Sequence, residues 1–426
     1  MNIQIRGNKF LANTGWMIGE RVFQMAISLV IGMITARYLG PENYGLINYT
    51  ASFVTMFLAI CTLGLEEVII KQFVDHPEQE GTALWTGIVM RCISSTISIL
   101  AISVIVFFLN PNDSLTLVVA ILQSIALLFR SFELIDYWYQ SRLQSKYVTI
   151  IKTTAYILIS VYKVILLVLK KDVRWFAFSN TLDMIIIAIL LVCFYYRSGG
   201  SGFRVSVSMG KSLITQSYHF ILSGLMTTVY GQTDKILIGE LLDNTSVGLY
   251  SVAITICGLW NFIPEAIINS ARPLIMQEKN KNEEIYIKRL KQLYACIIWL
   301  GIAFAVFVTI LSKYIVLFLY GKEYLDATTS LIIIVWSASF SLVGSARGIR
   351  ILSENKSKYV KKYIFWGTVC NLTLNFILIP LIGIEGAAIS TLVTQILTCL
   401  VAPIFYKETK VHTKYVIDAF LLRGIK

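Results

Sequence analysis

The sequence predicts an all-α integral membrane protein, and three observations support this fold class. Of the 426 residues, 56% are hydrophobic and 15% are charged, and the mean hydropathy is +0.70. Soluble domains average about 45–50% apolar and about 25% charged residues, so a soluble fold could not cover this excess. The apolar residues gather in about twelve stretches, each close to the roughly 20 residues that cross a bilayer. Several stretches also carry charged residues near their middles, which indicates an aqueous interior.

The apolar stretches predict the membrane spans in chain order. We expect spans at residues 13–36, 45–69, 83–109, 115–138, 148–170, 175–196, 213–239, 248–272, 291–319, 328–351, 362–380 and 386–406. Helices are expected because strands of a membrane barrel would be short and would alternate in polarity. The connections between spans are short and rich in Gly, Pro and Asn, so no soluble domain is expected between them.

The basic residues of the connections predict the orientation. Lys and Arg are far more frequent in the segments on the same side as the N-terminus than in those on the other side. Such residues concentrate on the cytoplasmic side, so we expect both termini to be cytoplasmic. The Gly-rich, basic segment 198–212 would then separate a six-helix bundle at 1–197 from a second one at 213–406, followed by a cytoplasmic tail at 407–426.

Two weak internal echoes favour a duplicated transporter. Residues Ile34–Leu46 and Leu237–Leu249 share a leucine and a Gly-Leu pair, and both follow the first span of a half. Likewise Leu143–Val148 resembles Asn355–Val360. Duplicated transporters bind their substrates between the repeats, so a site between the halves is expected. The tail, Val411–Lys426, is expected to form a short amphipathic helix on the inner surface.

Acidic residues within the spans are the candidates for ion coupling. A charge that faces lipid at mid-bilayer costs about 2.5–3.5 kcal/mol, so such residues normally face water or a partner. The expected coupling residues are Glu20, Glu66, Asp234 and Glu265. The alternative is that these residues form internal ion pairs or, for Glu66 and Asp234 near span ends, reach the interface.

Arginines within the spans are the candidates for substrate binding. A guanidinium stays charged and binds two oxygens of a phosphate at once. An anionic head group would therefore be attracted to a lumen lined by Arg21, Arg91, Arg272 and Arg347. On span 248–272, Arg272 shares one helical face with Asn261, Glu265 and Asn269. Further charges inside spans include Glu67, Arg130 and Glu133, and Asp183.

Other functional classes find little support. The net charge of +12 is spread between the spans and forms no single patch, which argues against a nucleic-acid partner. The seven cysteines lie in apolar stretches without metal or redox spacing. Phosphate loops, nucleophile elbows and metal-binding His-Glu helices are missing from the sequence, so no catalytic residue, no metal and no cofactor are expected.

Four segments resemble a known family. They are Ala36–Leu46 (ARYLGPENYGL), Asp234–Gly239 (DKILIG), Tyr320–Tyr324 (YGKEY) and Ile382–Ala388 (IGIEGAA). In this order they are similar to bacterial polysaccharide flippases of the Wzx type, in the multidrug/oligosaccharidyl-lipid/polysaccharide exporter superfamily. The resemblance extends across nearly the whole chain.

The resemblance implies two six-helix bundles around a central cavity in the cytoplasmic membrane of a bacterium. It implies translocation of an undecaprenyl-pyrophosphate-linked oligosaccharide, for an O-antigen or a capsule, from the inner to the outer leaflet. The implied partners are this lipid-linked substrate, membrane lipid, a polysaccharide polymerase and a chain-length regulator. Two alternatives are a multidrug antiporter of the same superfamily and a membrane-embedded polysaccharide polymerase or ligase.

Overall fold

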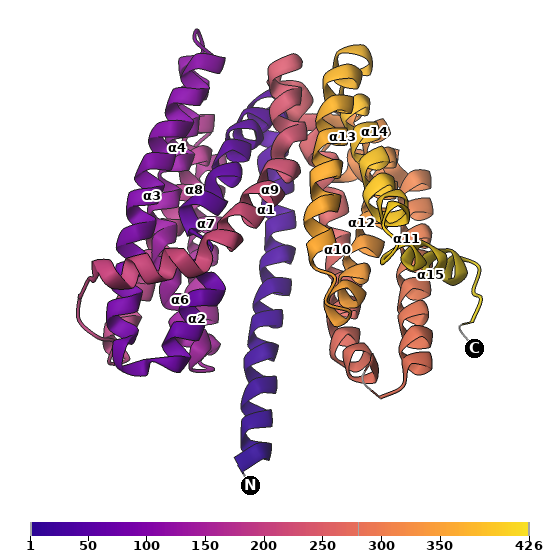
Figure 1. Cartoon of the computed structure of the whole chain (residues 1–426). Helices are drawn as coiled ribbons and strands as arrows, with labels where there is room; N and C mark the ends of the chain where they lie inside the picture. The colour runs from indigo at the N-terminus through magenta and orange to yellow at the C-terminus, as the bar shows by residue number, and fades with distance from the viewer. Residues whose placement is uncertain (1, 280, 425–426) are drawn as a thin grey trace. The chain divides into compact units, whose positions relative to one another are not determined.

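The chain is built of helices in both of its compact units. The computed structural model describes the backbone of residues 2–279 and 281–424, and the side chains of residues 19, 23–279 and 281–424. Packing divides the chain into two compact units, unit 1 (Met1–Gln232) and unit 2 (Thr233–Lys426). The boundary between the units falls inside one helix. Figure 1 shows the helices of each unit lying roughly side by side. The expected division into six and six spans at residues 198–212 stays a prediction.

Unit 1 contains the first eight helices and most of the ninth. They are α1 (Asn2–Thr62), α2 (Leu65–Asp75), α3 (Glu80–Leu109), α4 (Ser114–Ser124), α5 (Ala126–Arg130), α6 (Leu134–Ser141), α7 (Ser145–Val168), α8 (Val173–Arg197) and α9 (Val207–Leu241), with 3-10 turns at Pro77–Gln79 (η1) and Ser131–Glu133 (η2). Buried aromatic residues, among them Trp138 and Tyr195, pack between α2, α3, α6, α7 and α8 in its main core.

The first two expected spans are joined in α1. Its backbone leaves helical geometry at Gly40, which has φ 71° and ψ 170°, a conformation that glycine adopts without the strain a side chain would cause. Pro41 follows and lacks the backbone N–H that a continuous helix would need. The apolar segment Phe23–Asp75 is 53 residues long, enough for two crossings of the bilayer.

The fourth expected span, 115–138, is broken into three short helices. The turn η2 lies between α5 and α6, and Glu133 is in that turn. Backbone groups freed by such breaks are tolerated in membrane proteins where protein or water satisfies them. The break therefore brings polar side chains to the interior of unit 1.

Unit 2 begins near the end of α9 and contains the remaining helices. They are α10 (Asn244–Lys279), α11 (Glu283–Leu319), α12 (Ala327–Ser353), α13 (Lys358–Ile382), α14 (Ile384–Ile396) and α15 (Val411–Phe420), with a 3-10 turn at Lys322–Tyr324 (η3), a π-helical turn at Leu397–Val401 (η4) and a 3-10 turn at Ala402–Phe405 (η5). The expected spans from 248–272 to 386–406 each match one of these helices, except that the last is completed by η4 and η5, and the expected span 213–239 lies in α9.

Helices α13 and α14 form a tight hairpin. The connection turns at Gly383, which has φ 67°. A Cβ atom added to Gly386 would lie 2.4 Å from the carbonyl oxygen of Leu378, closer than side chains can approach a backbone. The glycines therefore let the two helices pack backbone against backbone.

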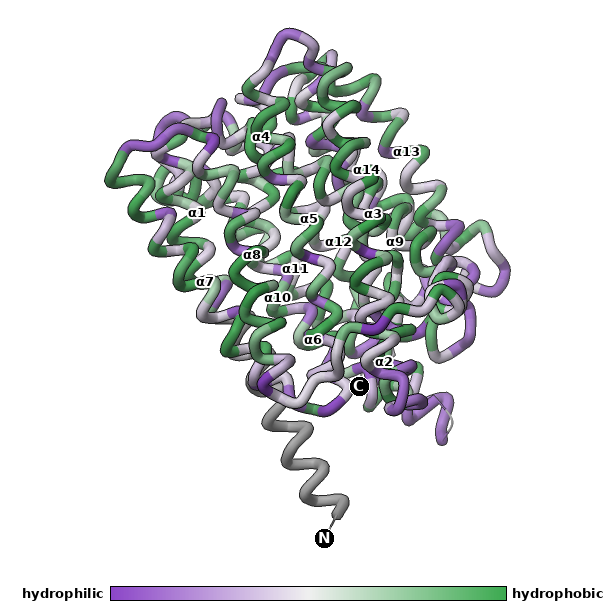
Figure 2. Tube along the Cα trace, turned by 90° about the vertical axis from the view of Figure 1, so that its left-hand side faces the viewer, coloured by the Kyte–Doolittle hydropathy of each residue, from purple (hydrophilic) through white to green (hydrophobic). Residues whose placement is uncertain are grey.

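The membrane fold class predicted from the sequence is confirmed. Ten helical segments among the described residues are long and apolar enough to cross a membrane, and one of them can cross twice. Helix α9 adds a long helix of lower hydropathy. Figure 2 shows hydrophobic residues along the lengths of the helices and hydrophilic residues concentrated at their ends and connections. The cytoplasmic placement of both termini stays a prediction.

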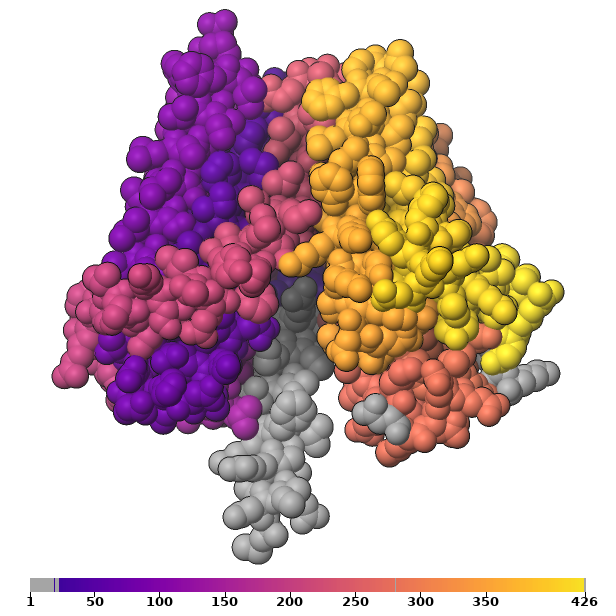
Figure 3. Space-filling view, viewed as in Figure 1, coloured from indigo at the N-terminus to yellow at the C-terminus, as the bar shows by residue number. Residues whose placement is uncertain are grey.

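Helix α15 lies on the surface of unit 2, where Figure 3 shows the C-terminal residues in yellow. Its buried face includes Val416 and Ala419, which belong to the core formed with α11 and α12. Lys291 on α11 forms an ion pair with Asp418 on α15 at 2.7 Å. The tail segment therefore contains the helix expected from its sequence, and that helix is anchored to the unit.

Candidate functional site

A polar cavity of about 470 Å³ lies within unit 1. This volume falls in the range of about 300–1,000 Å³ that is typical of ligand pockets. Its charged and amide-bearing lining residues come from α1 and from α5 to α8: Gln24, Arg130, Glu133, Asp136, Gln140, Lys152 and Asp183. The cavity therefore places charges of both signs inside a bundle of apolar helices.

Two ion pairs line this cavity. The Nε atom of Arg130 lies 3.2 Å from a carboxylate oxygen of Glu133, one turn further along the chain. The Nζ atom of Lys152 on α7 lies 2.5 Å from Oδ2 of Asp136 on α6. Gln140 donates a hydrogen bond of 2.9 Å to the other oxygen of Asp136. Most of the cavity's charges are therefore compensated by an opposite charge within the same unit.

Buried lining oxygens without a hydrogen-bond partner include Oδ1 of Asp183 on α8 and Oγ1 of Thr149 on α7. Lys163 interacts electrostatically with Asp183 and offsets part of its charge. A buried acceptor without a donor costs about 1–3 kcal/mol, so a ligand or water that donates to these oxygens would be bound favourably.

In unit 2, Asp234 is the centre of a hydrogen-bond network. Its Oδ2 accepts a hydrogen bond of 2.7 Å from the hydroxyl of Tyr250 on α10, and another from Thr391 on α14. Its Oδ1 accepts a hydrogen bond of 2.7 Å from the Nδ2 atom of Asn375 on α13. One carboxylate near the end of α9 thus contacts three other helices, and all three donors are neutral.

The Asp234 network contains further oxygens. Nδ2 of Asn375 also donates to Oδ1 of Asn371, one turn earlier on α13, at 3.1 Å. Oδ1 of Asn375 is buried without a hydrogen-bond partner, as is Oγ1 of Thr394 on α14. A carboxylate with amide and hydroxyl oxygens is the ligand type that hard cations prefer. With a single carboxylate, such a set suits a monovalent ion or a proton better than a divalent metal.

The polar stripe expected on span 248–272 lies on α10. Glu265, Asn269 and Arg272 are exposed, so other helices do not cover this face. Asn261 is partly buried, and its Oδ1 has no hydrogen-bond partner. Charged side chains avoid lipid, which indicates that this face of α10 contacts water.

Arg347 on α12 is partly buried beside the π-helical turn. It donates a hydrogen bond of 2.6 Å to the carbonyl oxygen of Thr398, and its guanidinium lies 4.6 Å from the ring centre of Tyr363. Its Nε atom is buried without a partner. The side chain thus stabilises the irregular end of the last span and keeps one donor available.

The remaining predicted site residues are in unit 1. Arg91 on α3 is 1% exposed, and its Nε donates a 2.9 Å hydrogen bond to the carbonyl oxygen of Thr62, the last residue of α1. Glu66 on α2 is exposed and interacts electrostatically with Arg91. Glu20 and Arg21 belong to α1, and their side chains lie outside the described part of the chain.

Sequence reasoning missed several polar residues that the fold brings together. Charges at Arg130, Glu133 and Asp183 were recognised inside spans, but their common cavity was not. Asn371 and Asn375, which contribute to the Asp234 network, were not singled out. Their four-residue spacing in an apolar segment was the available signal, because it places both amides on one helical face.

Bundles of long apolar helices with buried polar groups in each unit define a multi-pass membrane transporter. Comparison with known families gives the particular branch: a model described as "Polysaccharide biosynthesis protein" matches residues 10–275. The chain therefore belongs to the polysaccharide biosynthesis protein family. This confirms the resemblance to the polysaccharide branch that four short segments indicated.

Curated relatives align over almost the whole chain. The capsular polysaccharide biosynthesis protein CapF of Staphylococcus aureus is 20% identical over 93% of this chain and 99% of its own length. The putative O-antigen transporter of Escherichia coli (strain K12) is 22% identical over 88% of this chain and 91% of its own. The name of the second relative agrees with the prediction of a transport protein over that of a membrane-embedded enzyme.

Solved structures share the fold. The lipid II flippase MurJ in an inward closed conformation aligns with a TM-score of 0.72 at 14% identity, over 96% of this chain and 91% of that one. An inward-facing multidrug resistance transporter of the MATE family aligns with a TM-score of 0.66 at 13% identity, over 93% and 96% of the two chains. At these identities the likeness extends to the fold alone.

Proposed function

We propose that this protein is a flippase for a lipid-linked oligosaccharide in the cytoplasmic membrane of a bacterium. The substrate is an undecaprenyl-pyrophosphate-linked repeat unit of an O-antigen, capsule or exopolysaccharide, moved from the inner to the outer leaflet by alternating access. The single observation that carries the proposal is the polar cavity of about 470 Å³ within unit 1, in a chain of this family.

The chemistry of the cavity supports a sugar ligand. Hydroxyl groups of sugars both donate and accept hydrogen bonds, and the lining offers carboxylates, amides and cationic groups. Asp183 and Thr149 present buried oxygens without partners, which a sugar hydroxyl would satisfy. Because the ion pairs of the cavity already balance most of its charges, a neutral polar ligand can enter without leaving a charge uncompensated.

The pyrophosphate is assigned to arginines. Arg272 is exposed on the polar face of α10, so its guanidinium is free to contact an anionic head group directly. Arg347 keeps one buried donor available. Arg91 holds the end of α1, so we assign it a positioning role for the neighbouring α2 and α3. Arg21 remains a proposed contact on its sequence position alone.

Asp234 is the proposed coupling residue, with Glu20, Glu66 and Glu265 as further candidates. A cation or proton that binds at Asp234 would compete with hydrogen bonds from α10, α13 and α14. Binding would therefore change the free energy of contacts between four helices at once. Such a change is what an ion needs in order to shift the balance between two conformations.

The test is export by cells whose only copy of the gene carries R272A. We expect little surface polysaccharide and an accumulation of lipid-linked oligosaccharide at the inner leaflet, with normal amounts of the protein. The matched control is R197A, because Arg197 is an exposed arginine at the end of α8 and does not belong to the polar face of α10. Normal surface polysaccharide in R272A would remove the arginine assignment.

The same cells distinguish the multidrug alternative. If the protein is a flippase, deletion of the gene should abolish surface polysaccharide and leave drug susceptibility unchanged. If it is a multidrug exporter, deletion should leave surface polysaccharide unchanged and raise drug susceptibility. Unchanged polysaccharide in the deletion strain would contradict the proposed function as a whole, whichever residues are assigned to it.

A further inference from the structure

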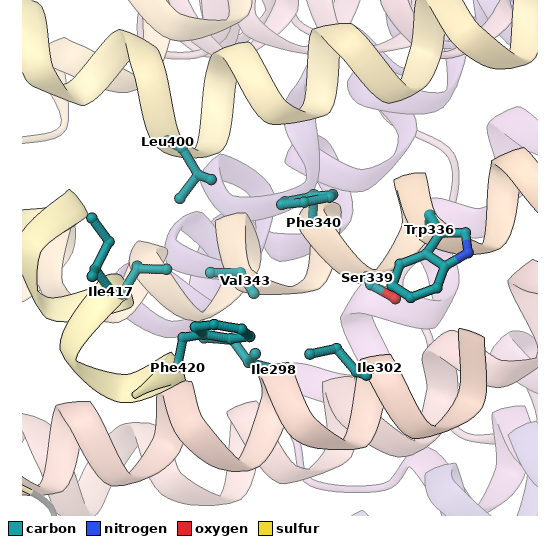
Figure 4. A pocket seen from close by; sticks show the side chains of 10 residues that line it. Ile298, Ile302, Trp336, Ser339, Phe340, Val343, Leu400, Ile417 and Phe420 are labelled. Atoms are coloured by element: carbon teal, nitrogen blue, oxygen red, sulfur yellow. The ribbon is translucent and has the colours of Figure 1, made fainter. Parts of the chain in front are cut away.

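An apolar pocket of about 330 Å³ lies in unit 2, between α11, α12, η4 and α15. Figure 4 shows its side chains: Ile298 and Ile302 on α11, Trp336 and Phe340 on α12, Leu400 on η4 and Phe420 on α15. Ser339 contributes the single hydroxyl, and it already donates to the carbonyl oxygen of Gly301 at 3.2 Å. Apart from the indole N–H of Trp336 the remaining lining is apolar, and water does not fill apolar cavities of this kind.

The charged residues around α15 mark the level of the lipid head groups, and the side of the pocket next to them is called its mouth. Lys291, which pairs with Asp418, lies where the polar start of α11 gives way to its apolar stretch. Trp299 is 45% exposed, and its ring is stacked on Phe420 at 5.8 Å.

The pocket lies at the depth of one leaflet. On α11 its lining residues are Ile298 and Ile302, about 10 and 16 Å beyond Lys291 at about 1.5 Å for each residue. Half of a hydrocarbon core of about 30 Å is about 15 Å. The pocket therefore presents its apolar wall to a lipid chain of that leaflet.

The charge around the mouth selects an anionic head group. Lys414 and Arg423 are exposed on α15 and just after it, and Asp418 is already paired with Lys291. The chain after α15 returns to Lys291, because a Cβ atom on Gly424 would lie 3.4 Å from its Nζ. The mouth thus carries more positive than negative charge.

We propose that this pocket binds one acyl chain of an anionic phospholipid, whose head group contacts Lys414 and Arg423. The occupant is a membrane phospholipid, and the site is separate from the polar cavity of unit 1. Bound lipid would complete the wall that α15 closes only in part, since Ile417 and Phe420 remain exposed on that helix.

The test uses the full chain in phosphatidylcholine vesicles that contain a minor fraction of phosphatidylglycerol. In one sample the phosphatidylglycerol carries brominated acyl chains, and in the other an equal fraction of phosphatidylcholine carries them. The quenching of Trp336 is obtained as the difference in quenched tryptophan fluorescence between the native chain and W336F. We expect stronger quenching by brominated phosphatidylglycerol, with an enrichment of about fivefold for each basic residue at the mouth.

The controls separate the pocket from bulk lipid. Quenching of Trp366, which is exposed on α13 and does not line this pocket, should show no preference between the two lipids. I302F should abolish the preference by filling the pocket, whereas I310F should keep it, because Ile310 is exposed two turns further along α11. K414E with R423E should abolish it too, without altering packing, whereas K313E should not.

Three results would overturn the proposal. The first is equal quenching of Trp336 by both brominated lipids in the native chain. The second is the same loss of preference in I310F or K313E as in the pocket and mouth variants. The third is complete displacement of brominated phosphatidylglycerol by a stoichiometric amount of undecaprenyl phosphate, which would assign the pocket to an isoprenoid chain. None of these results depends on polysaccharide export, so they leave the proposed function untouched.

Discussion

The two units bury charge in different ways. In unit 1, the carboxylates of Glu133 and Asp136 face cations around an open cavity. In unit 2, Asp234 is held by neutral donors from three helices. A cavity of balanced ion pairs can accept a neutral polar ligand without changing its own charge. The hydrogen-bond donors of Asp234 are all neutral, and its charged neighbour is Lys235, the next residue in the chain, so a small cation or a proton can instead neutralise this carboxylate. We therefore propose that the sugars of the ligand bind in unit 1 and that ion coupling centres on Asp234 of unit 2.

The largest effect is expected from D234N. The amide keeps the size of the side chain but removes the negative charge and presents an N–H₂ group to donors. We expect ion-driven export to fall on the order of 100-fold, near the upper end of coupling between sites. Transport of labelled substrate into vesicles with and without an ion gradient measures this.

Asp243 provides the control for D234N. Its carboxylate caps the start of α10 by accepting a 2.7 Å hydrogen bond from the backbone N–H of Ser246, and asparagine caps helices equally well. D243N should therefore transport normally. If D234N responds to the ion gradient like the native chain, coupling does not belong to unit 2 and the comparison fails.

The second effect concerns the stability of unit 1. K152M leaves Asp136 without its cation beside the cavity, so we expect the free energy of unfolding to fall by about 1–3 kcal/mol, below the cost for a fully buried pair. Thermal unfolding in detergent measures the change. R174M is the matched control, because the Arg174–Asp172 pair is more than half exposed and such pairs contribute about 0–1 kcal/mol. Equal losses in both variants would show that the cavity pairs are ordinary surface pairs.

A smaller effect is expected from D183N, which tests the cavity as a ligand site. Oδ1 loses no hydrogen bond within the protein, but Lys163 loses its electrostatic partner, so the free energy of unfolding should fall modestly. If a ligand donates to this oxygen, the loss of a charged acceptor should weaken apparent substrate affinity about 3–10-fold, with the maximal transport rate retained. D172N, at an exposed helix cap, should leave affinity unchanged. Loss of stability without loss of affinity in D183N would move the ligand site elsewhere.

The smallest effect concerns the attachment of α15. His412 is 1% exposed, and its burial, followed by the charges of Arg347 and Arg350, lowers its pKa well below 6.5. The folded state therefore holds a neutral imidazole, while the detached segment takes up a proton below about pH 6.5. The docking of α15 should weaken as the pH falls below this value, by at most about 1.4 kcal/mol for each pH unit.

Hydrogen exchange of the α15 amides, corrected for the intrinsic pH dependence, measures this weakening. H412Q should remove the pH dependence, because glutamine has no proton to gain. In unit 1 the amides of α6 serve as a reference that should not respond. A pH-dependent detachment that persists in H412Q would assign the effect to another group.

The fold was largely predictable, because a membrane span is a local property of about 20 residues. The interruptions within the spans were not predictable from the sequence. The π-helical turn before Ala402 occurs within apolar sequence, and the break between α5 and α6 falls at Arg130–Glu133, where the sequence shows the charges but not the end of a helix. Their backbone groups are satisfied by other helices, as when Arg347 donates to Thr398, and such contacts leave no local trace in the sequence.

The candidate site was predictable only in part, for a related reason. Glu265, Asn269 and Arg272 follow helical spacing, so the sequence of a single helix was sufficient to predict that they share one face. Two of the three donors to Asp234 lie 141 and 157 residues further along the chain. Asp234 was recognised as a charge in a span, and its partners could be recognised only once α13 and α14 were placed beside it.

The close approach of α13 and α14 changes how the Ile382–Ala388 segment should be used. Gly386 has no room for a methyl group beside Leu378, and Gly383 makes the turn. Selection at these positions would act on the assembly of the hairpin, whatever sugar is carried. Relatives with different polysaccharides are then expected to share this segment, and differences in cargo should be sought among the residues that line the cavity of unit 1.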